Sequence, residues 1–333
     1  MRLRRSDLRS PGLRRRRRGR GFEYLDGDER RLDDAEALER IHALVIPPAW
    51  DDVWICPYPN GHIQAVGVDV AGRKQYLYHS AWRERQDRVK FDQMLEFAQT
   101  LPRIRTRTVR DLRRDGLQRE RVLACAVRLL DRGFFRIGGE EYAEENGSYG
   151  LATLEKRHVR LEPDNLLVFD YPAKSGKRRL QAIVDPEVYD VVAELKGRRS
   201  GRELLAYRNG RWVDVRSGDI NEYIKELSGA DFTAKHFRTW HGTVIAAVAL
   251  AVAGDAASSS ASKRAMTRAV HEVAHYLGNT PAVARASYID PRVFDRYQAG
   301  MTIADALDEL GDVELGAPAT HGKIEQAVLE LLG

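Results

Sequence analysis

The sequence predicts an α+β protein, with a small N-terminal domain built on an antiparallel sheet and a larger, mainly helical domain after it. Three observations predict this arrangement. Residues 53–79 alternate apolar and polar positions around two glycine-containing turns, which is typical of strands in a meander. Beyond residue 80, apolar residues recur mostly at helical spacing. Finally, 333 residues with 43% hydrophobic content are enough to form two domains with buried cores.

The N-terminal β-containing domain is expected over residues 21–99. Asp33 and Asp34 can cap a short helix that ends near Leu44, ahead of two prolines. Three strands should follow, joined by turns at 59–61 and 71–72, and a helix should close the domain; these elements are expected at 53–55, 62–69, 74–79 and 81–99. Thr100–Pro102 is the expected link to the second domain.

The mainly helical domain is expected over residues 100–300. Its first helix has one apolar face, formed by Val122, Leu123, Ala126, Leu129 and Leu130. A hairpin of strands 166–171 and 179–184 should carry a basic tip at Pro172–Lys177. Further helices are expected at about 186–196, 219–228, 233–253 and 262–277, with a flexible connector at 254–261 and no internal repeat.

Charge is distributed unevenly along the chain, whose net charge is +5. Residues 1–20 contain ten Arg and one Asp, so we expect a disordered Arg-rich arm that binds polyanions. Residues 301–333 contain seven acidic residues and one Lys. This acidic C-terminal segment is expected to form one or two small helices or to shield a basic surface.

Several classes of protein are excluded at this stage. The longest apolar run, Val244–Ala253, is too short to span a bilayer and is rich in small residues, so it should be a packed helix. The N-terminus begins with arginines and lacks the apolar segment of a secretory signal. Cys56 and Cys125 have no metal-type or disulfide-framework spacing, so both are expected as reduced thiols in a cytoplasmic protein.

Three separated segments carry residues suited to one reaction. Arg136 lies at a glycine-rich helix end, Arg238 lies within Lys235–Gly242, and Tyr288 lies within Ala286–Pro291. Each guanidinium can bind two phosphate oxygens at once, and a phenol can act as a nucleophile. Together these groups suit nucleophilic attack on a phosphodiester.

Six motifs, in order, resemble those of type IB DNA topoisomerases of the compact, poxvirus-like class found in bacteria. The resemblance covers roughly residues 21–300. The motifs are Ile46–Trp50 (IPPAW), Gly72–His79 (GRKQYLYH), the segment around Arg136, Lys174–Lys177 (KSGK), the segment around Arg238, and Asn279–Pro281 (NTP) leading to Ser287–Tyr288. The implied fold is that of the tyrosine recombinase and topoisomerase IB catalytic domains.

The resemblance implies catalytic roles. Tyr288 would attack the scissile phosphate and form a 3'-phosphotyrosyl link, while Arg136 and Arg238 would stabilise charge on the non-bridging oxygens. Lys174 would protonate the leaving 5'-oxygen. Many family members carry a histidine nine residues before the tyrosine, where this chain has Asn279; an amide can donate a hydrogen bond but not a proton.

The resemblance also implies DNA contacts and a working form. Contacts are expected from five residues: Arg73, Tyr76, Tyr78, Tyr142 and Lys235. Tyr76 and Tyr78 share one strand face and could equally pack within a sheet. The expected protein is a nucleoid-associated monomer that closes around double-stranded DNA, without ATP, metal, cofactor, membrane or obligatory protein partner.

Three alternatives remain open on the sequence. The segment His271–His275 (HEVAH) fits the HExxH zinc pattern of metalloproteases, but its third ligand would have to come from remote residues such as Glu309 or His321. A tyrosine site-specific recombinase would use the same Arg, Lys, Arg and Tyr set. An inactive DNA-binding relative is the third alternative, which the complete set of residues disfavours.

Overall fold

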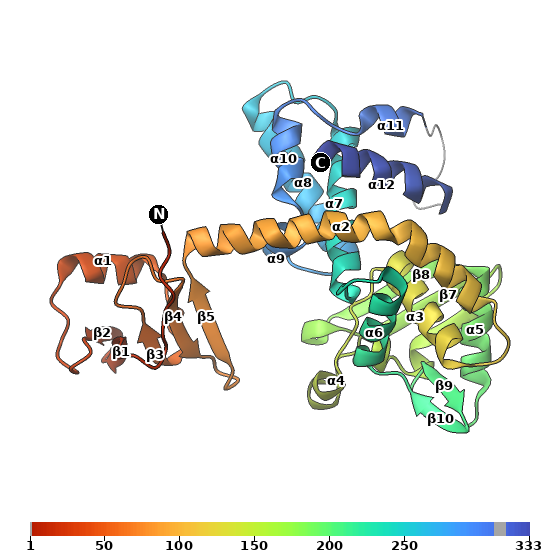
Figure 1. The fold of residues 1–333 in the computed structure, drawn as a ribbon, viewed down its shortest axis with the longest axis horizontal. Coiled ribbons are helices and arrows are strands. Elements are labelled where there is room, and N and C mark those ends of the chain that lie inside the picture. Colours follow the sequence, from red (N-terminus) through yellow and green to blue (C-terminus); the bar gives the residue numbers. More distant parts are fainter. Residues whose placement is uncertain (1, 310–317) are drawn as a thin grey trace. The chain divides into compact units, whose positions relative to one another are not determined.

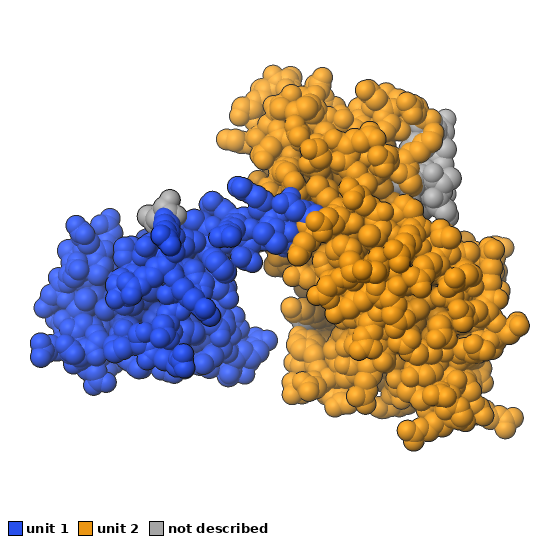
Figure 2. Space-filling view, in the orientation of Figure 1, with its two compact units in different colours: residues 1–92 blue, residues 93–333 orange. Residues whose placement is uncertain are grey.

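The computed structural model describes residues 2–309 and 318–333 and divides into two compact units, Met1–Asp92 and Gln93–Gly333 (Figure 2). The boundary therefore lies between residues 92 and 93, and not between 99 and 100 as the sequence indicated. Helix α2 (Ser80–Leu112) runs through this boundary without a break.

The prediction of a link at Thr100–Pro102 is wrong, because these residues lie inside α2. A proline inside a helix removes one backbone hydrogen bond, which normally favours a break. Here packing outweighs that cost: Phe97, Leu101 and Ile104 are fully buried, and the ring of Phe97 packs against Phe232 and Phe237 in the second unit's core.

Unit 1 is an antiparallel sheet with one short helix (Figure 1). Its strand order is β2-β1-β3-β4-β5, with bounds Leu13–Arg18 (β1), Gly21–Leu25 (β2), Asp51–Ile55 (β3), Ile63–Val68 (β4) and Lys74–Tyr78 (β5). Helix α1 (Ala35–Ala43) is capped by Asp34, whose carboxylate accepts a 3.1 Å hydrogen bond from the Ala37 amide. The predicted helix and the β3–β5 meander are confirmed.

The prediction that residues 1–20 form a disordered arm is wrong for its arginine run, which is strand β1. This strand pairs with β2 and β3, and Leu13 is buried in the core with Ile41 and Ile55. The Arg15 guanidinium donates to the carbonyl oxygens of Ile46, Pro47 and Trp50, so the IPPAW segment caps it. Partners far along the chain thus order a segment that could not fold alone.

Unit 2 is mainly helical. Two small antiparallel sheets complete it, with orders β6-β7-β8 and β10-β9. The strands are Val159–Glu162 (β6), Leu166–Pro172 (β7), Arg178–Val184 (β8), Ala206–Asn209 (β9) and Arg211–Asp214 (β10). The helices after α2 are Arg119–Gly133 (α3), Glu140–Asn146 (α4), Pro186–Gly197 (α5), Ser217–Ser228 (α6), Ala234–Ala253 (α7), Ser259–Leu277 (α8), Pro281–Ser287 (α9), Pro291–Gln298 (α10), Ala304–Asp308 (α11) and Pro318–Leu332 (α12).

The core of unit 2 forms around α3 and α7. The predicted apolar face of α3 is completely buried, and so are Phe237 and Trp240 of α7. The predicted hairpin β7–β8 and the four later helices are confirmed, although α8 begins inside the expected connector, at Ser259. In the acidic C-terminal segment the structure describes two helices, α11 and α12; residues 310–317 lie outside the described part of the chain.

Within residues 2–309 and 318–333, no helix has both the length and the apolar character that crossing a membrane requires.

Candidate active site

The C-terminal end of α8 gathers three arginines from different elements. The last backbone carbonyls there lack the usual partner four residues later, although His275 O accepts from the capping Gly278 N at 3.1 Å, and they carry the negative end of the helix dipole. Arg136 Nη2 donates to Gly278 O at 2.8 Å, and Arg238 Nη2 donates to Leu277 O at 2.9 Å. Arg179 Nη1 donates to His275 O at 3.3 Å, and its Nη2 donates to Tyr276 O. Four consecutive carbonyls therefore hold three guanidiniums at one place.

Arg238 is the most deeply buried of the three, with 4% of its surface exposed. Its Nη1 also donates to the carbonyl of Phe134, and its Nε makes no hydrogen bond within the described structure. Burial lowers the pKa of Arg238 to about 10, and nearby Tyr288 acts in the opposite direction. The side chain stays cationic at neutral pH, with one N–H directed at no protein acceptor.

Arg136 is positioned by a tight backbone loop. Helix α3 ends at Gly133, its capping residue Phe134 is left-handed (φ 53°), and the chain then passes Gly138 (φ 83°). A Cβ on Gly150 would lie 2.5 Å from the Gly138 backbone, and Leu151 N donates to Arg136 O at 2.8 Å. The two glycines therefore allow the close approach that fixes Arg136.

Asn279 is oriented by Arg136. The guanidinium Nη2 of Arg136 donates to Asn279 Oδ1, and Asn279 N donates to Ala274 O at 2.9 Å. With its oxygen occupied, the amide leaves Nδ2, which is buried and has no hydrogen-bond partner in the described structure. A buried donor without a protein partner is costly in a folded protein and calls for an explanation, such as a bound water, ion or ligand.

Tyr288 follows α9 and lies against α7. Its ring centroid is 5.1 Å from the Arg238 guanidinium carbon. A Cβ on Gly242 would lie 2.5 Å from the Tyr288 carbonyl oxygen, so only glycine allows this approach. The next residues are also fixed, because Asp290 N donates to Thr243 Oγ1 at 3.1 Å and the Asp290 side chain caps α10. The backbone at Tyr288 is therefore held against Gly242 and Thr243, which lie on α7 one helical turn after Arg238.

We expect Gly242→Ala to damage both stability and catalysis. The added methyl group forces α7 away from Tyr288, which should cost about 1–3 kcal/mol of unfolding free energy. A displacement of about 1 Å at a reacting phenol should slow its reaction by roughly 10²-fold. Thermal unfolding and single-turnover cleavage measure the two effects.

Gly218→Ala in α6 is the matched control, since a Cβ there meets nothing within 4 Å. It should be neutral or slightly stabilising, because alanine favours a helix over glycine. Equal stability and equal reaction rates of the two variants would contradict the proposed role of Gly242 in holding Tyr288.

Lys174 is placed at the exposed tip of the β7–β8 hairpin, in the short turn Lys174–Gly176. It makes no hydrogen bond or ion pair with any described residue. The turn is closed by Ala173 N donating to Lys177 O at 2.8 Å. The structure therefore brings Arg136, Arg238, Asn279 and Tyr288 together, and leaves Lys174 on a separate projecting turn.

The residues expected to contact DNA are all on the surface. Tyr76 and Tyr78 stack on each other with centroids 6.0 Å apart and stay 39% exposed, so they are not buried by sheet packing. Arg73 pairs with Asp69 at 3.0 Å, also in unit 1. In unit 2, Tyr142 is exposed on α4, and Lys235 is exposed in the first turn of α7.

The HExxH segment lies on α8, with His271, Glu272 and His275 exposed. Among the described residues, no group of three His, Cys, Asp or Glu side chains is placed to hold a metal ion. The side chain of His321 lies outside the described residues. Within the site, this helix supplies the carbonyls of residues 275–278.

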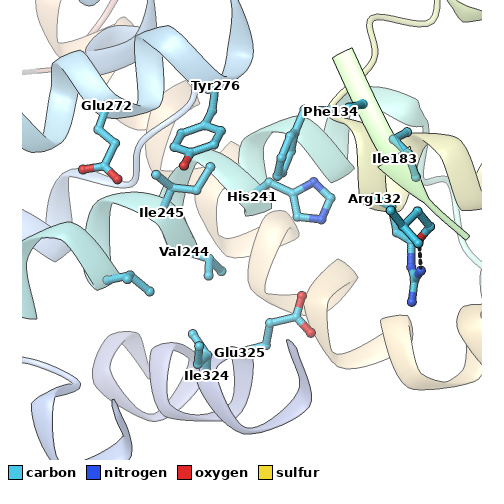
Figure 3. Close-up of a pocket in the computed structure, with 13 residues that line it drawn as sticks. Arg132, Phe134, Ile183, His241, Val244, Ile245, Glu272, Tyr276, Ile324 and Glu325 are labelled. Carbon is cyan, nitrogen blue, oxygen red and sulfur yellow. Dashed lines mark hydrogen bonds between the residues drawn. The ribbon is translucent and has the colours of Figure 1, made fainter. Parts of the chain in front are cut away.

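A cavity of about 420 Å³ lies on another side of α7 (Figure 3). Its lining comes mainly from β8, α7, α8 and α12, and is largely apolar around His241. It contains none of Arg136, Lys174, Asn279 or Tyr288, so it is separate from the candidate active site.

Two residues of the site were missed on the sequence. Arg179 was treated only as part of a strand. It follows Arg178 directly beside the basic hairpin tip, and nothing in that local sequence indicates its contact with the end of α8. Gly242 stood in the Arg238 motif, but its contact with Tyr288 depends on the packing of α7.

Two family models match the chain. Residues 79–307 match the catalytic core of eukaryotic DNA topoisomerase I, and residues 21–69 match the N-terminal domain of bacterial DNA topoisomerase IB. The DNA topoisomerase 1B of Acanthamoeba polyphaga mimivirus is 30% identical over 295 residues, covering 86% of this chain and 88% of that protein.

More distant relatives match over shorter lengths. The DNA topoisomerase 1B of vaccinia virus (strain Copenhagen) is 25% identical over 41% of this chain and 45% of its own length. DNA topoisomerase 1 beta of Arabidopsis thaliana is 25% identical over 52% of this chain, which corresponds to 18% of that protein.

The fold, the site and these matches define an enzyme of the DNA topoisomerase class. Within that class, the chain belongs to the type IB family. The zinc metalloprotease and site-specific recombinase alternatives are thereby set aside.

Proposed function

We propose that this enzyme relaxes supercoiled duplex DNA by cutting one strand, letting the duplex swivel and rejoining the strand. The observation that supports it best is the position of Tyr288 against the buried Arg238, beside the Arg136–Asn279 pair. A phenol, two guanidiniums and an amide donor therefore lie close enough together to be proposed as the contacts of one phosphate.

In the proposed reaction, the Tyr288 phenolic oxygen attacks the scissile phosphorus and loses its proton. A bond forms between phosphorus and the tyrosine oxygen, and the bond from phosphorus to the 5'-oxygen breaks. The products are a 3'-phosphotyrosyl link and a 5'-hydroxyl. Because the phosphodiester is conserved in the covalent link, the 5'-hydroxyl can attack in the reverse direction without ATP.

Arg136, Arg238 and Asn279 are proposed to stabilise the transition state. Negative charge grows on the non-bridging oxygens during attack, and fixed donors aimed at it lower the barrier. Arg238 Nε and Asn279 Nδ2 are buried and have no hydrogen-bond partner in the described structure, so both are proposed to donate to the phosphate while the two residues keep the protein contacts that orient them. Guanidiniums and an ammonium supply the electrostatic stabilisation, so the proposed chemistry needs no metal.

Lys174 is proposed as the general acid for the 5'-oxygen. An alkoxide leaves poorly unless a proton is delivered to it. An exposed ammonium at a hairpin tip, with no partner among the described residues, is free to turn toward bound DNA. Tyr76, Tyr78, Arg73, Tyr142 and Lys235 are proposed as DNA contacts, mostly to the backbone.

Lys174→Ala should therefore cleave ordinary DNA about 10²- to 10⁴-fold more slowly than the wild type. A substrate whose bridging 5'-oxygen is replaced by sulfur has a leaving group that needs no proton, so its cleavage by this variant should be nearly normal. Single-turnover rates on the two substrates measure the difference. Lys177→Ala, at the same hairpin tip, should keep normal cleavage of both; failure of sulfur to restore Lys174→Ala would argue against general acid catalysis.

The proposed function is tested with the unmodified protein. Purified enzyme should relax plasmids of either supercoil sign in the presence of a strong chelator and without nucleotide. Rapid denaturation during the reaction should trap protein on a 3' DNA end, leaving the 5' end free for labelling by a kinase. A requirement for metal or nucleotide, or protein attached to the 5' end, would refute the mechanism. We also propose that the enzyme acts as a monomer at the nucleoid. The same relaxation assay at high dilution tests the monomer, because an obligate oligomer would lose activity when it dissociates.

A further inference from the structure

Helix α12 is built into the core of unit 2. Ile324, Val328 and Leu332 are buried on one side of it, and Glu325 is only 8% exposed. The match to the topoisomerase I catalytic core ends at residue 307, so α12 lies beyond it. A buried carboxylate on a terminal helix requires a specific partner, because an unpaired buried charge is strongly destabilising.

The partners of Glu325 are Arg105 of α2 and Trp240 of α7. Its carboxylate accepts from Arg105 Nη1 at 2.5 Å and Nη2 at 2.9 Å, and from Trp240 Nε1 at 2.9 Å. Arg105 also binds Asp131 of α3, with bonds of 2.8 and 2.9 Å. Four helices therefore meet at one largely buried hydrogen-bonded group, which we call the Glu325 cluster (Arg105, Asp131, Trp240 and Glu325).

The charges in this cluster are strongly coupled. Burial disfavours the ionised form of Asp131, yet Arg105 holds its pKa well below the usual value. The pKa of Arg105 is raised in turn, because its two carboxylate partners outweigh the effect of burial. Removing either carboxylate leaves part of a largely buried guanidinium unpaired, which costs more than loss of a surface ion pair.

Two residues of the Glu325 cluster lie on the same two segments of the chain that carry Arg238 and Arg136. Trp240 follows Arg238 by two residues on α7, and Asp131 precedes Phe134 by three residues on α3. The Phe134 carbonyl is itself a partner of Arg238, and Arg136 comes two residues later. Figure 3 shows Glu325 of α12 and His241 of α7 facing the same cavity, with Phe134 beyond the imidazole. The cluster therefore ties the two elements that present Arg136 and Arg238.

We propose that Glu325 is a positioning residue for DNA cleavage: by binding Arg105 and Trp240 together, it holds α7 against α3 so that Arg238 and Arg136 converge on one phosphate. This inference rests on the proposed function. Glu325 does not touch the reacting atoms, so its loss should lower the rate of covalent chemistry and leave DNA affinity nearly unchanged.

The test compares full-length Glu325→Gln and Glu325→Ala with the wild type. At saturating enzyme and well below the melting temperature, Glu325→Ala should form the covalent complex about 5- to 30-fold more slowly, with the dissociation constant for DNA changed by less than about threefold. Glu325→Gln keeps an acceptor for Trp240 and loses the charge that pairs with Arg105, so an intermediate rate is expected. It also serves if the alanine variant does not fold.

Two controls separate positioning from general destabilisation. Val328→Ala shortens a fully buried side chain of the same helix that takes no part in the hydrogen bonds of the cluster, and Glu330→Gln removes an exposed acid. Both should cleave at the wild-type rate, even if Val328→Ala melts earlier. A cycle with Trp240→Phe, which removes the Nε1 donor together with the five-membered ring of a fully buried side chain, should be non-additive with Glu325→Ala.

The inference is overturned if Glu325→Ala cleaves normally, or if Val328→Ala at a matched loss of stability cleaves as slowly. It is also overturned if the Trp240 and Glu325 effects simply add. A failure of the proposed function looks different, because the wild type itself would then not form the covalent complex.

Discussion

Tyr288→Phe should bind DNA and fail to relax it. The change removes one hydroxyl oxygen, which is the atom proposed to attack phosphorus, and no neighbouring group can replace it. Loss of a catalytic nucleophile lowers turnover by roughly 10⁴- to 10⁶-fold. The ring still packs beside Arg238, so the fold and the arginine positions should persist. Plasmid relaxation, covalent trapping and equilibrium DNA binding measure the three quantities.

Tyr207→Phe is a suitable control, since Tyr207 lies on β9 and belongs to no part of the site. It should relax plasmid at the wild-type rate. Measurable relaxation by a pure Tyr288→Phe preparation, or a covalent adduct on another residue, would remove Tyr288 as the nucleophile. A large loss of DNA binding by the same variant would instead show a role in substrate affinity.

Local patterns predicted most of the regular structure. The apolar face of α3 and the alternation in β3–β5 depend on residues two to four positions apart, so a short stretch of sequence is enough to predict them. The arginine run of β1 could not be predicted, because the carbonyls that bind Arg15 come from residues 46–50. The long helix α2 was divided wrongly at Pro102 for a related reason, since burial of Phe97 and Leu101 overrides the proline.

The candidate site was predicted in its residue types, apart from Lys174, which lies on a separate turn, and not in its framework. Arg136, Arg238, Asn279 and Tyr288 were selected from motifs, and the structure places them in mutual contact or close approach. The framework is the end of α8, whose carbonyls bind Arg136, Arg179 and Arg238. No local pattern indicates that an arginine on β8 will reach the end of a helix about a hundred residues later.

The choice of carbonyls as partners has a chemical consequence. Among the ion pairs of the described residues, neither Arg136, Arg179 nor Arg238 is paired with a carboxylate. A carboxylate would bind a guanidinium more strongly than a neutral carbonyl does and would compete with a phosphate. It would also repel the negative charge that is proposed to develop in the transition state. Carbonyls at a helix end orient the guanidiniums and leave their full positive charge available to DNA.

Arg238→Ala should therefore lose roughly 10³- to 10⁵-fold in the rate of covalent complex formation, a loss comparable to removal of an arginine that stabilises a phosphoryl-transfer transition state. Arg238→Lys should recover only a small part of this rate. A single ammonium keeps the charge, but it cannot donate to Phe134 O and Leu277 O and also to phosphate in the fixed fork of a guanidinium. Single-turnover cleavage measures both variants, and thermal melting shows whether they are folded.

Arg211→Ala, on the exposed hairpin β9–β10, controls for the loss of one positive charge and should cleave normally. If Arg238→Lys cleaves within about threefold of the wild type, then charge alone is sufficient and the geometry of the fork is irrelevant. If a folded Arg238→Ala cleaves nearly as fast as the wild type, the arginine serves only to join α7 to α8. Slow cleavage by both variants at near-normal DNA affinity is the pattern that transition-state binding requires, because ground-state binding would appear in the dissociation constant instead.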